Sequence, residues 1–256
     1  MRSYAASIGF AALLFFAWEA GVRALDIPAF VAPAPSAILK AMVAGFAEAN
    51  YVGHCLVTVS EALSGFVLGA TLGLVAGILI VLSPVMEKVI YPWVVALQSM
   101  PKVAIAPLLV VWFGFGLASK VVVVTLVTLF PVLVNVVAGL RNVDQERLDL
   151  MLGLSASRWQ VMRYLRLPNA LPFIFAGLNT AIVFSITAAI VGEFVGATKG
   201  LGYLILQANY SLDIAAVFAL LIVLAAVGIL LHSLVQFAES HIVFWSKSQD
   251  MNPGAP

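Results

Sequence analysis

Few residues in this chain have the types and spacing that metal binding or catalysis requires. Cys55 is the single cysteine, which excludes an internal disulfide, and His54 precedes it. Neighbouring residues on a helix point about 100° apart and no third ligand stands nearby, so we expect no metal site at this pair. The sequence also lacks G-x-x-x-x-G-K-S/T, H-E-x-x-H and G-x-S-x-G, the motifs of phosphate-binding loops, zinc proteases and serine hydrolases. We therefore predict no catalytic residue, no metal and no cofactor.

Two glutamates lie in or beside long apolar stretches, where a charge is costly and usually faces a protein interior or an aqueous cavity. Glu61 precedes a glycine-rich run, and it either lies in solvent at the edge of its stretch or faces inward. Glu193 follows Gly192 near the end of another stretch. We name Glu193 as a candidate for a transport pathway or gate, with a structural hydrogen bond as the alternative.

Pro92, Pro101 and Pro107 interrupt one apolar stretch. Interior prolines remove a helix hydrogen bond and kink the chain, and broken helices within membranes line cavities or pathways. Lys102 follows Pro101 directly, so it either faces the pathway and attracts an anion or extends to the lipid headgroups. Pro101, Lys102 and Pro107 therefore join Glu193 as pathway or gate candidates.

The strongest periodic signal is a row of four glycines, Gly65, Gly69, Gly73 and Gly77. Residues spaced four apart share one face of a helix, and small residues on such a face let another helix approach closely in lipid. We predict that these glycines form a helix-packing face.

Composition decides the class of protein that must position these residues. Of 256 residues, 63% are hydrophobic and 10% are charged, whereas soluble domains are about half apolar and about a quarter charged. Too few polar residues remain to cover a soluble globule, and disordered chains are poor in apolar residues. The net charge of +1 gives no basis for nucleic-acid binding. The apolar runs are continuous rather than alternating, so we predict an all-α polytopic membrane protein.

A membrane-spanning helix needs about 20 mostly apolar residues. Eight Lys and Arg residues on one side of the predicted spans against four on the other favour an N-in, C-in orientation. The first span is either a cleaved signal peptide or an uncleaved helix, and Glu19 with Arg23 at i, i+4 favours the uncleaved helix. We predict one transmembrane domain over 1–256 with six spans, at 8–25, 57–82, 89–115, 121–140, 172–195 and 214–236.

The segment 141–171 is too polar to span, because eight charged residues fall within it. Its apolar residues keep helical periodicity, so we predict an amphipathic helix at the cytoplasmic surface between the fourth and fifth spans. Ser157 can cap its second part, and Pro168 and Pro172 are expected to end it. The helix either rests on headgroups or docks a soluble partner.

The same segment resembles a motif of bacterial ABC importer permeases, E-A-A, three residues, G, nine residues, I-x-L-P. Leu165-Arg166-Leu167-Pro168 matches its end, and counting back places Ser155 at the glycine and Asp149 at the glutamate. Both alanines and the glycine are replaced. The run Ala156–Gln160 is similar to the nitrate/sulfonate/taurine group of these permeases, and further resembling stretches lie at 32–36, 106–116, 130–131 and 200–203.

This resemblance implies a permease in the bacterial inner membrane that is not itself an enzyme. Two copies, expected to be identical, would pair, and two ATPase subunits would dock on the 141–171 segment as a coupling helix. A periplasmic or lipid-anchored binding protein would deliver the substrate, and membrane lipid would surround the spans. By the resemblance, the ATPase-docking residues are Asp149, Ser155, Ala156, Ser157, Arg158, Trp159 and Pro168.

The resemblance implies a small polar or anionic substrate of the nitrate, sulfonate or taurine class, and close relatives make a thiamine-precursor pyrimidine or riboflavin the alternative. A secondary transporter is the competing class, for which internal repeats or several midplane ionisable residues are expected. A membrane-embedded enzyme or an assembly factor would need a catalytic constellation.

Overall fold

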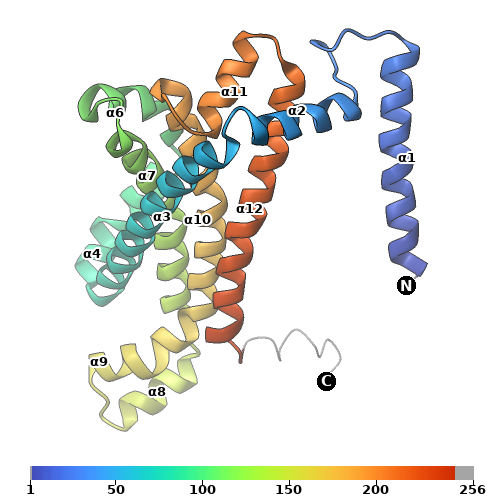
Figure 1. The fold of residues 1–256 in the computed structure, drawn as a ribbon. Helices are drawn as coiled ribbons and strands as arrows, with labels where there is room; N and C mark the ends of the chain where they lie inside the picture. Colours follow the sequence, from blue (N-terminus) through green and yellow to red (C-terminus); the bar gives the residue numbers. More distant parts are fainter. Residues whose placement is uncertain (1, 246–256) are drawn as a thin grey trace.

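The computed structural model describes residues 2–245, with the side chains of Ser7 and of residue 9 onward, and this part of the chain contains no β-strand. In chain order the elements are α1 (Arg2–Ala24), α2 (Pro35–Ala47), α3 (Tyr51–Leu82), α4 (Pro84–Val89), α5 (Tyr91–Gln98), the 3₁₀-helix η1 (Lys102–Ile105), α6 (Ala106–Phe113), α7 (Leu117–Arg141), α8 (Gln145–Gly153), α9 (Arg158–Val161), the π-helix η2 (Met162–Arg166), α10 (Leu167–Gly196), α11 (Leu201–Tyr210) and α12 (Ile214–Ile242) (Figure 1).

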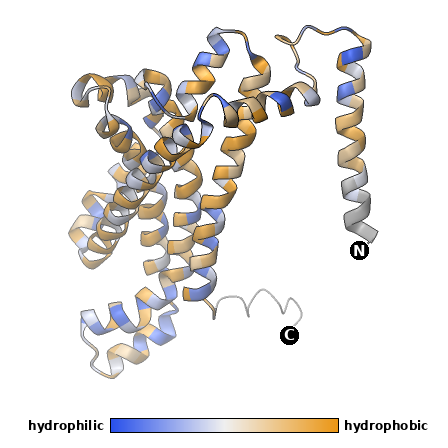
Figure 2. Ribbon diagram, in the orientation of Figure 1, coloured by the Kyte–Doolittle hydropathy of each residue, from blue (hydrophilic) through white to orange (hydrophobic). Residues whose placement is uncertain are grey.

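Within the described residues, four helices are long and apolar enough to cross a membrane: α3, α7, α12, and α10 together with α9 and η2. A fifth crossing results if α5 and the η1–α6 segment, which meet at a bend of 83°, form one span. The predicted spans 57–82, 121–140, 172–195 and 214–236 lie within α3, α7, α10 and α12, and 89–115 covers the bent pair. Figure 2 shows hydrophobic residues along these helices.

The first predicted span, 8–25, covers α1 up to its last residue, Ala24. This helix is not one of the four named above, and it stands apart from the other helices in Figure 1. The Trp18 ring packs edge-on against Phe218 of α12, with ring centroids 6.1 Å apart. The carboxylate of Glu19 accepts hydrogen bonds from the backbone N–H (3.0 Å) and the hydroxyl of Ser36. These contacts tie the last two turns of α1 to α12 and α2.

The glycine row lies on α3 against α7, and all four glycines are buried. A Cβ atom added at Gly69 would lie 2.1 Å from the Thr128 hydroxyl oxygen, and one added at Gly73 would lie 2.7 Å from the Leu129 carbonyl. No side chain fits at these distances, so the two backbones approach as closely as only glycine permits. The Thr128 hydroxyl donates to the carbonyl of Val124 (2.8 Å) within its own helix, so it is not left unpaired.

The prediction that Pro168 and Pro172 end the amphipathic helix is wrong. Residues 158–196 form one continuous helical run, with Pro168 in the first turn of α10 and Pro172 inside it. A proline normally breaks a helix because it lacks an N–H and collides with the carbonyl four residues earlier. Here the wider π-turn η2 precedes it, with the Leu167 N–H donating to the Met162 carbonyl, and such a turn accommodates the ring. The second half of 141–171 is therefore an extension of α10.

Candidate functional site

Residues 145–166, here named the polar segment, comprise α8, a bend, α9 and η2. They lie at the end of the bundle opposite to α6 and α11 (Figure 1), and hydrophilic residues gather there in Figure 2. All the acidic residues of this region come before the bend, and the basic residues other than Arg147 of α8 come after it. Acidic side chains occupy or precede α8 and basic ones follow the bend: Asp144, Glu146 and Asp149 against Arg158, Arg163 and Arg166.

The first arm, α8, begins at a side-chain cap. The carboxylate of Asp144 accepts from the Glu146 N–H (3.1 Å) and so satisfies one of the free donors at the helix start. One turn on, the Gln145 amide donates to the Asp149 carboxylate (2.9 Å), which is otherwise exposed. Asp149 therefore lies on the water-facing side of α8.

The bend is built around Ser155, whose φ of 56° lies in the left-handed region that glycine usually occupies. The Ser155 N–H donates to the Leu152 carbonyl (2.9 Å), and the Ala156 N–H donates to the Met151 carbonyl (3.0 Å). These two bonds are the pair that closes a Schellman helix end, where glycine is the commonest residue at the position held by Ser155. Ser155 is also the position that the sequence motif aligns with a glycine.

The second arm begins at Ser157 with a reciprocal capping box. The Ser157 hydroxyl accepts from the Gln160 N–H (3.3 Å), and the Gln160 side chain accepts from the Ser157 N–H (2.7 Å). Two exposed residues, Arg158 and Trp159, therefore lie in the first turn of α9, and the Trp159 side chain is 64% exposed. A large aromatic residue that is fixed on a rigid turn and open to solvent is a typical anchor for a partner protein.

Of the seven predicted docking residues, six lie on α8, the bend or α9. Pro168 does not; it is half-buried in the first turn of α10. Beside it, the Asn169 side chain donates to the Asn142 carbonyl, which ties the start of α10 to the end of α7. Pro168 therefore belongs to the junction between the polar segment and the bundle.

Glu193 lies at the other end of α10, is 1% exposed, and has a partner on each carboxylate oxygen. The Thr58 hydroxyl donates to Oε1 (2.6 Å), and the Gly202 N–H donates to Oε2. Thr58 accepts in turn from the Leu201 N–H (2.8 Å). Nδ1 of His54 accepts from the Gly200 N–H (3.0 Å). The first turn of α11 is thus held by side chains of α3 and α10.

Glu61 forms a buried ion pair with Lys120, 3.1 Å between Nζ and the carboxylate, which joins α3 to α7. The interpretation that Glu61 lies in solvent is therefore wrong, because both side chains are enclosed by the bundle. The second carboxylate oxygen of Glu61 is buried without a hydrogen-bond partner. Breaking such a pair by removing one partner leaves an uncompensated buried charge, at a cost of about 3–5 kcal/mol.

The proline-flanked candidates lie elsewhere. Nζ of Lys102 donates to the Gln98 carbonyl (2.8 Å) and stands 4.6 Å from the centre of the Phe130 ring on α7. Pro101 immediately precedes η1, and Pro107 lies in the first turn of α6. Lys102 contacts residues of α5 and α7, whereas Glu193 is hydrogen-bonded to residues of α3 and α11. Among the described residues, no three His, Cys, Asp or Glu side chains gather as metal ligands.

Residues 69–243 match the model of the family described as binding-protein-dependent transport system inner membrane component. The chain belongs to this permease family. It is 36% identical to the riboflavin transport system permease protein RibX of Chloroflexus aurantiacus, with 92% of this chain and 88% of that protein covered. It is 32% identical to the putative aliphatic sulfonates transport permease protein SsuC of Bacillus subtilis, over 88% and 81% of the two chains.

An inward-facing structure of the MetNI methionine ABC transporter has the same fold, with a TM-score of 0.63, 22% identity, and coverage of 75% of this chain and 94% of that one. The family that residues 69–243 match is one of membrane transport permeases and not of enzymes. This family implies an ATPase and a substrate-binding protein as partners.

Sequence reasoning missed several residues that organise the permease. His54 was weighed only as a metal ligand, and Thr58 carried no signal of its own, although both hold the start of α11. The signal that pointed to this region was the Gly200-Leu201-Gly202 run. A Cβ atom at Gly200 would lie 2.3 Å from the Glu193 carboxyl group, so the run marks the place where backbone meets a buried acid.

Proposed function

We propose that this permease forms the substrate pathway of an ABC importer in the bacterial inner membrane and that a separate ATPase drives it through the polar segment. The observation that carries this proposal is the arrangement of residues 145–166. A capped, bent pair of helices exposes Trp159 at the polar end of an otherwise apolar bundle. The full complex contains two permease copies, two ATPase subunits and one binding protein.

Coupling follows from the continuity of α9, η2 and α10. A force on Trp159 acts on a helical run that extends to Gly196 without an interruption. Near its far end, Glu193 holds α3 and α11 through hydrogen bonds. An element with two arrangements, whose equilibrium both sites bias, is the physical basis for coupling between them. Movement of the ATPase therefore shifts the packing of α3, α10 and α11 and opens or closes the pathway.

The same proposal includes six spans with both ends of the chain in the cytoplasm. The beginning of α1 and the end of α12 lie at the same end of the molecule as α8 and α9 in Figure 1, which supports this orientation. Arg158, Arg163 and Arg166 also lie at that end, in accord with the excess of basic residues on cytoplasmic segments.

The substrate proposed is a small polar or anionic solute of the nitrate, sulfonate and taurine class. The relatives include an aliphatic sulfonate permease by name. A riboflavin permease and a formylaminopyrimidine permease, also by name, keep riboflavin or a thiamine-precursor pyrimidine as the alternative. Thermal-shift screening of the partner binding protein, followed by uptake in proteoliposomes, decides between them. Stabilisation by taurine or alkyl sulfonates supports the first class, and stabilisation by riboflavin or the pyrimidine replaces it with the second.

The coupling proposal is tested by co-purification of the ATPase with Trp159→Ala and Ser155→Arg variants. Removing an aromatic anchor that is buried in the docked complex weakens binding by about 2 kcal/mol or more. We therefore expect at least about tenfold weaker ATPase retention. Tyr210→Ala serves as the control, since Tyr210 is also exposed but lies on α11 at the opposite end. Full retention by both variants contradicts the proposal. Uptake that continues with a hydrolysis-deficient ATPase indicates a secondary transporter instead.

A further inference from the structure

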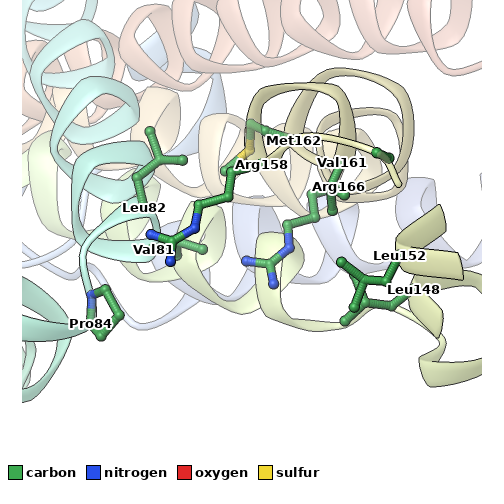
Figure 3. A pocket seen from close by; sticks show the side chains of 10 residues that line it. Val81, Leu82, Pro84, Leu148, Leu152, Arg158, Val161, Met162 and Arg166 are labelled. Atoms are coloured by element: carbon green, nitrogen blue, oxygen red, sulfur yellow. The ribbon is translucent and has the colours of Figure 1, made fainter. Parts of the chain in front are cut away.

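A pocket of about 270 Å³ opens between the end of α3 and the polar segment (Figure 3). Val81 and Leu82 of α3 line one side, and Leu148 and Leu152 of α8 line the other. Figure 3 shows the guanidinium groups of two arginines extending between these apolar walls. The arginines are Arg158 and Arg166, which both line the pocket.

The two guanidinium groups have no acidic partner among the described residues. Ion pairs at this end of the bundle join Arg141 to Glu87 (2.5 Å) and Arg147 to Asp144 (3.6 Å), and none includes Arg158 or Arg166. Nε of Arg166 is buried without a hydrogen-bond acceptor. A buried donor on a charged group is costly when unpaired. Two guanidinium groups that extend into one pocket, one of them with this buried unpaired donor, favour an anion with several acceptor oxygens.

The position of the pocket identifies the anion. Leu82 is the last residue of α3, a helix long and apolar enough to cross the membrane, so the pocket lies where that span meets the headgroup layer. Its walls are apolar, which suits the glycerol and acyl portions of a lipid better than an inorganic ion. Basic pockets between spans on the cytoplasmic side bind anionic lipid headgroups. This step rests on the proposed function, which assigns the polar segment to the cytoplasmic surface.

We propose that Arg158 and Arg166 bind the phosphate of an anionic phospholipid in this pocket. The lipid bridges the end of α3 to α8 and α9, because its phosphate lies on the arginines while its apolar part contacts both walls. It thereby fixes the orientation of the polar segment relative to the bundle before any ATPase docks.

The test uses the complete complex in nanodiscs of phosphatidylcholine, with and without phosphatidylglycerol, in wild type and Arg166→Gln. Native mass spectrometry counts retained phosphatidylglycerol, and thermal unfolding measures the stabilisation that it gives. We expect about tenfold weaker retention in Arg166→Gln, since a charge-assisted fork is lost. Arg163→Gln is the matched control, because it removes the same charge from an exposed residue of η2 that does not line the pocket.

Equal decreases of phosphatidylglycerol retention in Arg163→Gln and Arg166→Gln overturn the proposal. They would indicate a general attraction of anionic lipid to the basic surface. Equal stabilisation by inorganic phosphate in pure phosphatidylcholine overturns it in favour of a free-anion site. Phosphatidylglycerol retention that is undiminished in Arg166→Gln overturns it outright. If Arg166→Gln does not assemble, Arg166→Lys carries the same comparison, because it keeps the charge and loses the planar fork. ATPase co-purification in the same samples shows separately whether the coupling proposal fails.

Discussion

Glu193 shows how one side chain is fixed by residues far away in the sequence. Its charge within an apolar stretch singles it out, and both of its oxygens are bound, by Thr58 and by Gly202. The sequence could point to the acid but not to Thr58, because a lone threonine in an apolar helix carries no pattern and pairs across 135 positions. Ser155 was easier to place, since the motif puts a glycine at this position, where the chain needs a positive φ.

Gly200 provides the prediction at this scale. Gly200→Ala puts a Cβ 2.3 Å from the Glu193 carboxyl group at a φ of 115°. Gly114→Ala has a comparable backbone (φ 78°) with nothing within 4 Å. In both variants the backbone strain of a non-glycine residue lowers the free energy of unfolding by about 1–3 kcal/mol. The clash lowers it by about a further 1–3 kcal/mol at Gly200 alone. Thermal unfolding of the purified permease should show the larger decrease in unfolding temperature for Gly200→Ala. Equal decreases in the two variants would contradict the close contact between residue 200 and the Glu193 carboxyl group.

At the scale of elements, sequence periodicity predicts which face of a helix is packed better than it predicts which helix packs against that face. The glycine row indicates a close-packed face on the second span, but four small residues do not reveal that α7 is the helix that lies against it. The prediction of a helix end from the prolines was wrong for a different reason. Pro168 and Pro172 indicate a helix end by the usual rule, whereas the π-turn before Pro168 accommodates its ring and Pro172 lies inside the helix that continues. No pattern in one sequence distinguishes a proline that ends a helix from one that a wider turn accommodates.

The α3–α7 contact gives the prediction at this scale. Gly69→Ala should destabilise the permease by about 1–3 kcal/mol, because the new methyl group overlaps the Thr128 hydroxyl. Thr128→Ala in the same chain should recover part of that loss by removing the obstructing atom. Thermal unfolding of the two single variants and the double variant measures the coupling. Gly228→Ala is the control, since its nearest neighbour would be Ile186 at an ordinary 3.6 Å.

At the scale of the whole molecule, composition predicted a helical membrane protein, but not how its outer surface is used. Large apolar side chains remain exposed on the bent α5–α6 pair, including Trp93 and Val111. In a membrane these must contact lipid or a second permease copy, since exposed apolar patches of this kind mark interfaces. The prolines alone do not predict how sharply α5 and the η1–α6 segment bend, because a proline indicates that a helix is kinked but not by what angle.

The orientation of the molecule is open to a direct test, because Cys55 is the single cysteine. In a Cys55→Ala background, Glu146→Cys should react with a membrane-impermeant maleimide only after cells are permeabilised. Tyr210→Cys, exposed on α11 at the opposite end, should react in intact cells. The expected contrast follows from N-in, C-in topology with the polar segment inside. The reverse labelling pattern would place the polar segment outside and rule out its contact with an ATPase.

The unbroken run from Arg158 to Gly196 makes rotation as important as displacement. On a helix, removing one residue turns everything beyond it by about 100°. A deletion within α10, between Leu167 and Glu193, would therefore leave Trp159 and Glu193 present but facing in mismatched directions. The bend at Ser155 carries a different constraint, because its left-handed φ and the two hydrogen bonds that close α8 fix where α9 begins. A change in the length of α10 can thus uncouple Trp159 from Glu193 without substituting either residue, because their relative orientation depends on the number of residues between them.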